Sequence, residues 1–128
     1  MRYFQEYSGG IEDVKETLNL FSDIVEKSII PEIPIPELKR IRAVFPEEPS
    51  HLLDEVRTAL FEEEDDAKLK SVEDALRKLK EDLSNLADGA QDSLERRLLN
   101  VLHMCAEKLA ALLAYKRIQI QLARDKGD

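Results

Sequence analysis

The hydrophobic pattern of residues 68–88 is the most regular in the chain, and it predicts an amphipathic helix. Apolar residues recur at alternating spacings of three and four, at Leu69, Val72, Leu76, Leu79, Leu83 and Leu86. This a/d spacing is typical of a helix that packs lengthwise against another helix. Gly89 then stands where glycine favours the end of a helix.

Residues 93–124 predict a longer helix with two neighbouring apolar stripes. One stripe contains Leu94, Leu98, Val101, Cys105 and Leu112, and the other contains Leu99, Leu102, Leu109, Leu113 and Ile120. The remaining narrow face carries Asn100, His103, Glu107, Ala111, Ala114, Arg117 and Gln121. Asp92 and Glu95 have the spacing of a capping box, which opens a helix. Because only a few residues separate this helix from the preceding one, the two must form an antiparallel hairpin.

The second stripe exceeds what a surface helix needs, because one apolar stripe is enough to attach a helix to a core. We therefore expect the excess to be covered by the rest of the chain, by a second copy or by another protein. A homodimer is the expected assembly, since closed two-fold pairing is the commonest way to bury such a surface. The predicted interface residues are Leu99, Leu102, Leu109, Leu113 and Ile120.

The N-terminal half predicts shorter elements. A seam from Ile11 to Val25 indicates a helix over residues 11–28, and a second helix is expected over 51–61. Between them, residues 29–36 read IIPEIPIP, which predicts an extended apolar strap, and Pro36 can open a short helix that ends at Pro46. Five consecutive acids, residues 62–66, leave open whether 51–61 and 68–88 form one helix.

The predicted fold is all-α, a helical bundle built on a long antiparallel αα-hairpin of about residues 68–88 and 93–124. An N-terminal helix and the Pro-rich strap pack against the hairpin. Residues 1–128 form a single domain in this prediction, with an N-terminal arm at 1–10 and a frayed tail at 125–128. The length of 128 residues suits one domain with a modest core.

Charge and composition narrow the classes of partner. The net charge is −8, and residues 1–66 hold 7 Lys and Arg against 17 Asp and Glu. This balance argues against nucleic acid as the main partner, because phosphate binding needs clustered cations. We expect a cytoplasmic protein with no membrane contact, since no apolar run reaches the length of a span and no signal peptide is visible. The single cysteine, Cys105, is expected to be a small buried hydrophobe.

The acidic run provides the alternative function. Within it, Glu62, Glu63, Asp65 and Asp66 would share helix faces, and carboxylates so spaced can hold Mg²⁺. Residues 60–66 resemble the first acidic pair of all-α nucleotide pyrophosphohydrolases of the MazG type, which implies a magnesium-dependent phosphohydrolase. The E-x-x-D pair that this family carries on its next helix is missing here. A solvated acidic connection is the competing interpretation.

Other candidate chemistry is sparse. His103 and Glu107 lie four residues apart on the polar face of the last helix and could form a hydrogen-bonded pair. We assign no catalytic residues and no cofactor, because the sequence contains no nucleophile motif, phosphate loop or zinc-ligand spacing. The predicted function is a non-enzymatic assembly or adaptor protein that acts through its long C-terminal helix.

Overall fold

The computed structural model describes residues 10–29, 49–91 and 93–127, and within them it is all-α, as predicted. The helices are α1 (Gly10–Ile29), α3 (Pro49–Phe61), α4 (Asp66–Gly89) and α5 (Ser93–Gly127). The described residues contain no strand. The strap at 30–36, the short helix expected after Pro36 and residues 1–9 of the N-terminal arm lie outside the described residues.

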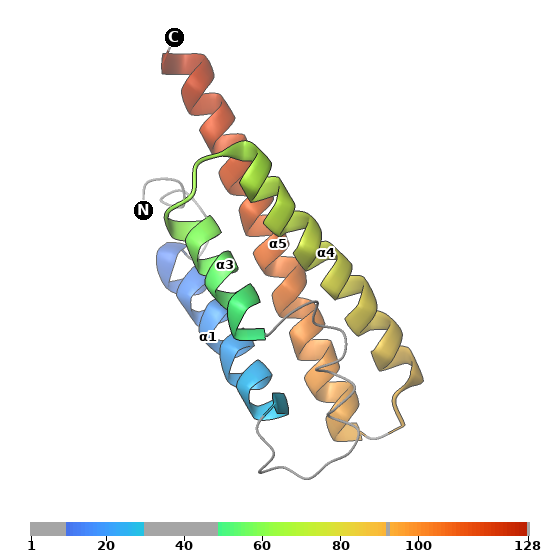
Figure 1. Ribbon diagram of the computed structural model, residues 1–128. Coiled ribbons are helices and arrows are strands. Elements are labelled where there is room, and N and C mark those ends of the chain that lie inside the picture. The colour runs from blue at the N-terminus through green and yellow to red at the C-terminus, as the bar shows by residue number, and fades with distance from the viewer. Residues whose placement is uncertain (1–9, 30–48, 92, 128) are drawn as a thin grey trace.

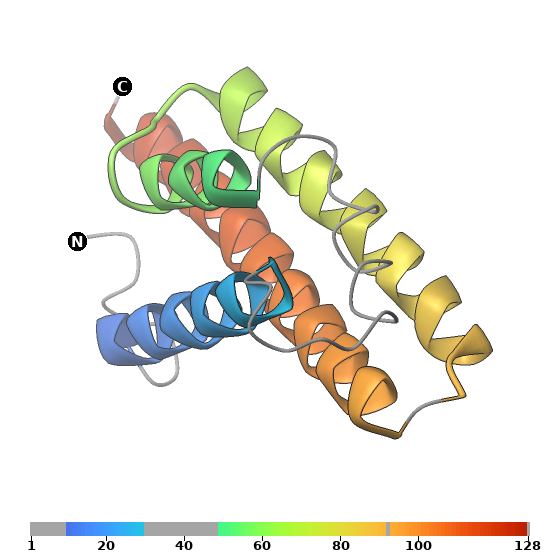
Figure 2. The same ribbon diagram turned by 60° about the horizontal axis from the view of Figure 1, so that its bottom comes forward.

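Helix α5 is the central element of the bundle. Helices α4 and α5 lie side by side and antiparallel, which confirms the predicted hairpin, whereas α1 and α3 pack on another side of α5 (Figures 1 and 2). All three other described helices contact α5. The C-terminal turns of α5 extend past the start of α4 (Figure 1).

The turn of the hairpin is fixed by two hydrogen bonds around Ala90. The Ala90 N–H donates to the Ala87 carbonyl at 3.3 Å, and the Arg96 guanidinium donates to the Ala90 carbonyl at 2.6 Å. The first bond occupies a carbonyl at the end of α4 that has no partner within the helix, and the second ties α5 back to the turn. The antiparallel order is therefore set locally.

Helices α3 and α4 are separate, which answers the question that the acidic run left open. The Glu62 and Glu63 N–H groups both donate to the Thr58 carbonyl at 2.8 Å, and this turn closes α3. Asp65 is extended, with φ −74° and ψ 118°, and it precedes the first residue of α4. Because like charges three and four residues apart repel on a helix, five consecutive carboxylates favour an open connection.

The core is built from apolar faces of the four described helices, and leucine dominates on α3, α4 and α5. The seam of α4 is confirmed, since four of its six positions are buried and Val72 and Leu86 pack against the core. Helix α1 contributes Val14, Leu18, Phe21 and Ile24, and α3 contributes Leu52, Leu53, Val56, Ala59 and Leu60. Most of the apolar residues of α5 therefore pack against the other helices of the same chain.

The five predicted interface residues are part of this core. Leu99, Leu102, Leu109, Leu113 and Ile120 are all buried within the single chain. The prediction that they present a surface to a partner needs correction, because α5 is covered by helices of its own chain on two sides. The apolar excess of α5 is the consequence of its central place in the bundle.

Helix α5 continues to Gly127, three residues beyond the predicted end at Arg124. The residues expected to form the start of a frayed tail at 125–128 are thus helical up to Gly127. No glycine or proline interrupts the helix before that position, so its hydrogen-bond pattern can continue.

Replacing a core leucine of α5 should destabilise the folded chain strongly. Leu109→Ala should lower the free energy of unfolding by about 2–5 kcal/mol, because the side chain is fully buried and leaves a cavity. Leu20→Ala is the matched control at a position that is 43% exposed, and its cost should stay below about 1 kcal/mol. Urea titration measures both values; equal losses would contradict the assignment of Leu109 to the core.

Candidate functional site

One face of α5 is not covered by the other described helices. It is marked by Arg97, Met104, Ala111, Ile118 and Asp125, which recur every seven residues and are all exposed. A helix drifts about 20° per seven residues, so successive members of this series lie on one slowly turning line, and the drift from Arg97 to Asp125 adds up to about 80°. Leu122 lies one turn after Ile118 on the same side. We call these six residues the exposed α5 face.

The exposed α5 face is unusually apolar for an uncovered surface. Met104 is 54% exposed, Ile118 is 58% exposed and Leu122 is 47% exposed. Across the described residues, the only other large hydrophobic side chain that is this open is Leu20 on α1. Leu20 and Met104 line the same groove of about 230 Å³ between α1 and α5, so the apolar area continues onto α1.

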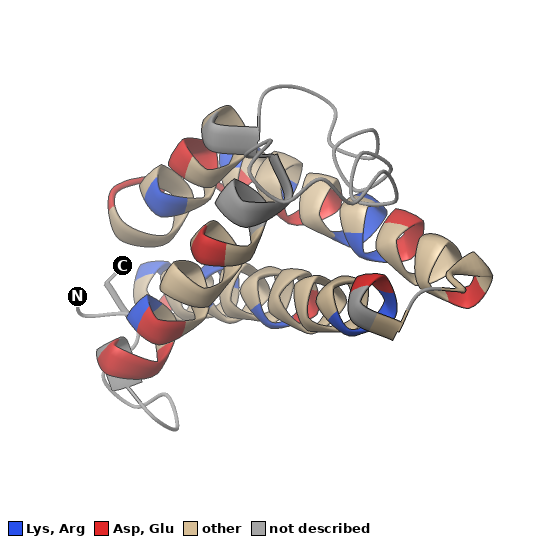
Figure 3. Ribbon diagram, turned by 90° about the horizontal axis from the view of Figure 1, so that it is seen from below, with Lys and Arg blue, Asp and Glu red and all other residues tan. Residues whose placement is uncertain are grey.

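Ion pairs frame this surface on both sides. On the α4 side, the Lys80 ammonium lies 3.3 Å from a carboxylate oxygen of Glu107. On the α1 side, the Lys108 ammonium donates to Asp13 at 2.7 Å, where acidic residues recur along α1 (Figure 3). Both pairs join α5 to a neighbouring helix. They therefore fix the angle at which α5 presents its uncovered side.

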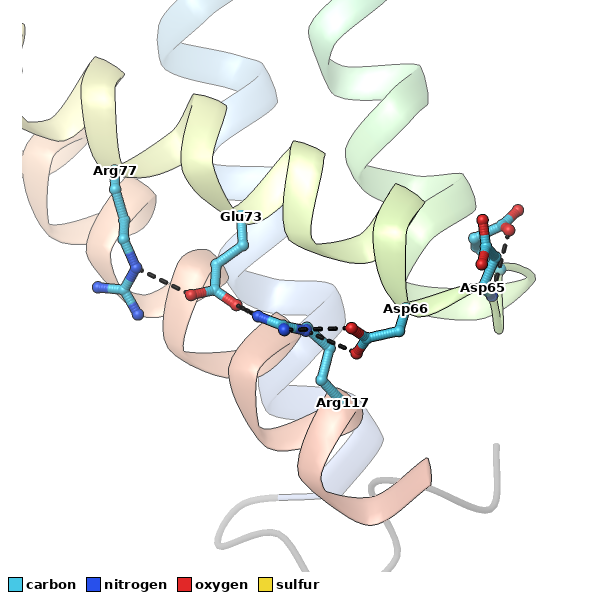
Figure 4. A network of polar contacts seen from close by, with 6 residues as sticks. Asp65, Asp66, Glu73, Arg77 and Arg117 are labelled. Atoms are coloured by element: carbon cyan, nitrogen blue, oxygen red, sulfur yellow. Dashed lines mark hydrogen bonds and ion pairs between the residues drawn. The ribbon is translucent and has the colours of Figure 1, made fainter. Parts of the chain in front are cut away.

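A second set of charged contacts ties α5 to the first turns of α4. The Arg117 guanidinium donates to both carboxylate oxygens of Asp66, at 2.9 and 3.3 Å, and to Glu73 at 3.1 Å (Figure 4). Glu73 is buried, and its other oxygen accepts a bond from Arg77 at 3.0 Å. Such bidentate arginine contacts combine energy with a fixed geometry. They hold α4 in register on α5.

The same contacts shift two pKa values. The hydrogen bond from Arg117 holds the pKa of the Asp66 carboxyl below its ordinary value, and Arg124 and Lys70 act in the same direction. The bonds to Asp66 and Glu73 raise the pKa of Arg117. Both shifts favour the charged forms of Asp66 and Arg117, as expected for an ion pair.

Lys116 connects α5 to the end of α3. Its side chain is 1% exposed, and its ammonium donates to the carbonyls of Ala59 at 2.7 Å and Leu60 at 3.1 Å. These carbonyls belong to the last turn of α3, where backbone acceptors have no partner within the helix and the helix dipole favours a cation. Desolvation by burial lowers the pKa of Lys116, against the opposing effect of Glu64 and Glu63.

The acidic run does not assemble into a metal site. Asp66 is turned toward Arg117, whereas Glu63 accepts a bond from the Asp65 N–H at 3.3 Å (Figure 4). Glu62 and Asp65 are exposed. The described residues, which include the whole run, hold no group of three or more His, Cys, Asp or Glu that could bind a metal ion. The open connection between α3 and α4 separates carboxylates that a continuous helix would have aligned.

The other sequence candidates have structural roles. Glu107 pairs with Lys80 of α4, and His103 lines a groove between α4 and α5 together with Arg77 and Asn85. Cys105 is buried, and burial raises the pKa of its thiol, so the expected role as a small hydrophobe fits.

Comparison of the chain with family models, curated proteins and solved structures finds no match.

The expectation that no segment is long and apolar enough to span a membrane needs correction for α5. Residues Glu95–Asp125 are long and apolar enough to cross a membrane by length and composition, since an 18-residue stretch within them has a mean hydropathy of 1.3, and 44% of that stretch is buried. From the sequence we expected no such segment, because no apolar run reaches the length of a span. The core helix of a water-soluble bundle has the same composition, and α1, α3 and α4 cover two sides of α5.

Sequence reasoning missed the exposed α5 face, although its signal was present. The narrow face that it described as polar contains Ala111, but Met104 and Ile118 were assigned to no stripe. Their spacing of fourteen residues, with Ala111 midway, is four helical turns and places them on one line. The interface was predicted on a leucine-rich stripe instead, because the stripes beside Met104 and Ile118 contain more apolar residues.

The contact between Glu73 and Arg117 should be energetically coupled. A double-mutant cycle with Glu73→Ala and Arg117→Ala should give a coupling free energy of about 1–2 kcal/mol, because Glu73 is buried and its bond to Arg117 joins two helices. The pair of Asp54 and Arg57 is the control. Its guanidinium nitrogen and carboxylate oxygen are 3.5 Å apart and both side chains are exposed, so its coupling free energy should stay below about 0.5 kcal/mol. Urea unfolding measures both cycles, and indistinguishable values would contradict the assigned network.

Burial of Lys116 should make its contribution to stability depend on pH. Between its lowered folded pKa and the ordinary value of 10.5, the unfolded chain binds more protons than the folded chain, so stability rises with pH in this window. The difference in unfolding free energy between wild type and Lys116→Met should therefore shift in favour of the wild type as the pH rises toward 10.5. Lys78→Met, at an exposed position of α4, controls for the loss of one positive charge. The same pH trend in both variants would overturn the effect assigned to burial.

Proposed function

We propose that this protein is a non-enzymatic helical assembly or adaptor protein that binds another helix through the exposed α5 face. The observation that carries the proposal is that Met104, Ile118 and Leu122 are about half exposed on one side of α5, whose other sides are packed as far as Ile120. Apolar residues at helical spacing are how a helix docks against a second helix. Large apolar side chains that stay exposed together on one side of an element are a mark of interaction sites.

The rigidity of α5 supports the proposal. Its opposite sides pack against three helices, and the contacts of Glu107, Lys108 and Arg117 fix its orientation. A surface that is already ordered loses little conformational entropy when a partner docks, so this cost offsets less of the binding free energy. The flanking charges favour a partner whose own charges complement them.

The alternative of a magnesium-dependent nucleotide phosphohydrolase has less support. It requires Glu62, Glu63, Asp65 and Asp66 to converge on one ion, whereas Asp66 pairs with Arg117 and Glu63 with the Asp65 backbone. Rearranging Asp66 toward a metal would break a bidentate contact to α5. We further infer a cytoplasmic location, in keeping with a chain whose only cysteine is a buried free thiol.

The test places a photo-reactive phenylalanine analogue at residue 118 of the full chain in cells that make the protein. Irradiation should give a cross-linked product at this position, identified by mass spectrometry as a second copy or as another protein. The same analogue at Ser71, an exposed position of α4, is the matched control and should give none. Equal labelling at both positions, or no product at 118, would overturn the proposal.

A further inference from the structure

The exposed α5 face is arranged symmetrically about Ala111. Met104 precedes Ala111 by seven residues and Ile118 follows it by seven; Arg97 and Asp125 lie fourteen residues before and after it. If two copies of α5 lie antiparallel with their Ala111 residues opposite each other, Met104 of each copy faces Ile118 of the other. The small side chain at the centre lets the two helices approach closely.

Charges at the ends of this line agree with the same arrangement. If the two helices wind around each other in the left-handed sense that keeps a seven-residue line in contact, the antiparallel register brings Arg97 of each copy next to Asp125 of the other, so two pairs of opposite charge form. In a parallel arrangement each of these residues would face its own kind, and both ends would be repulsive. The antiparallel order also sets the two helix dipoles head to tail.

The positions beside the line do not oppose this register. Glu107 falls opposite Tyr115, and Lys108 falls opposite Ala114, so no like charges face each other there, whereas Leu122 falls opposite Asn100 and gains no apolar partner on α5. Glu107 and Lys108 are in addition paired with Lys80 and Asp13 of their own chain. Leu20 of α1, which lines a groove with Met104, extends the apolar area at each end of the contact.

We propose that the partner of the exposed α5 face is a second copy of this chain, docked antiparallel about a two-fold axis at Ala111. This inference rests on the proposed function and names its partner. The contact is isologous, so each apolar or charged pair away from the axis occurs twice. It differs from the homodimer expected from the sequence, because that interface used residues that lie in the core.

Charge exchange between positions 97 and 125 tests the register. Arg97→Asp and Asp125→Arg should each weaken the dimer by about 5- to 30-fold, because two attractive pairs become repulsive. The double variant should recover the wild-type dissociation constant, and so should an equimolar mixture of the two single variants. Sedimentation equilibrium over a concentration series measures these constants, with Ser71→Asp as the control for an added surface charge.

Cross-linking tests the direction independently. Ala111→Cys should form a disulfide-linked dimer under mild oxidation, whereas Met104→Cys should not cross-link to itself, because it faces Ile118 of the other copy. A wild type that is monomeric at about 100 μM would overturn the second copy as partner. Self-linking of Met104→Cys, or single charge variants that dimerise like the wild type, would overturn the antiparallel register.

The outcomes separate this inference from the proposed function. A photo-product between residue 118 and a different protein would leave α5 as a binding surface and refute the second copy. A photo-product with a second copy, together with unaffected charge variants, would refute only the register. No product at residue 118 would refute both.

Discussion

Burial of α5 on two of its sides is the constraint on which the rest of this structure depends. Helix α4 follows it antiparallel, and α1 and α3 pack on another side (Figure 2). Aromatic residues make up only 5% of the chain, so the core relies on many leucine contacts. Each such contact is weak alone but adds to a large apolar area removed from water. The remaining side of α5 stays open because no described helix lies over it.

Polar contacts in this bundle select the arrangement more than they supply stability. The ion pairs of Lys80 and Lys108 are partly exposed and contribute little free energy each. Their geometry nevertheless discriminates among rotations and translations of packed helices, which leucine contacts tolerate well. The buried contacts of Glu73 and Lys116 impose a stronger condition, since a buried charge that lost its partner would be costly.

Much of the fold could be predicted because the spacing of leucines in residues 68–88 and the short turn before Ser93 depend on local rules. Whether Leu109 and Leu113 lie in the core of the chain or at an interface with a partner could not be predicted in the same way. A fully apolar stripe looks the same whether its own chain or a partner covers it. The Lys116 contact could not be predicted either, because the carbonyls that it binds, those of Ala59 and Leu60, lie more than fifty positions earlier in the chain, and the spacing of residues within α5 does not indicate them. The magnesium-site hypothesis for the acidic run assumed that its carboxylates lie on one continuous helix. The run instead forms the connection between α3 and α4.

Lys116 and Arg117 are neighbours in the sequence, yet they hold different helices, α3 and α4. These two contacts fix the number of residues that α5 can have between the hairpin turn and Lys116. Inserting or deleting one residue between the hairpin turn and Lys116 would rotate both side chains by about 100° relative to the core, so both helices would lose their attachment together. A seven-residue change would keep the rotation but displace both contacts by about 10 Å along the axis. Beyond Ile120, the last buried residue described on α5, residues 121–125 are all exposed, so a change in length there would leave these contacts in place.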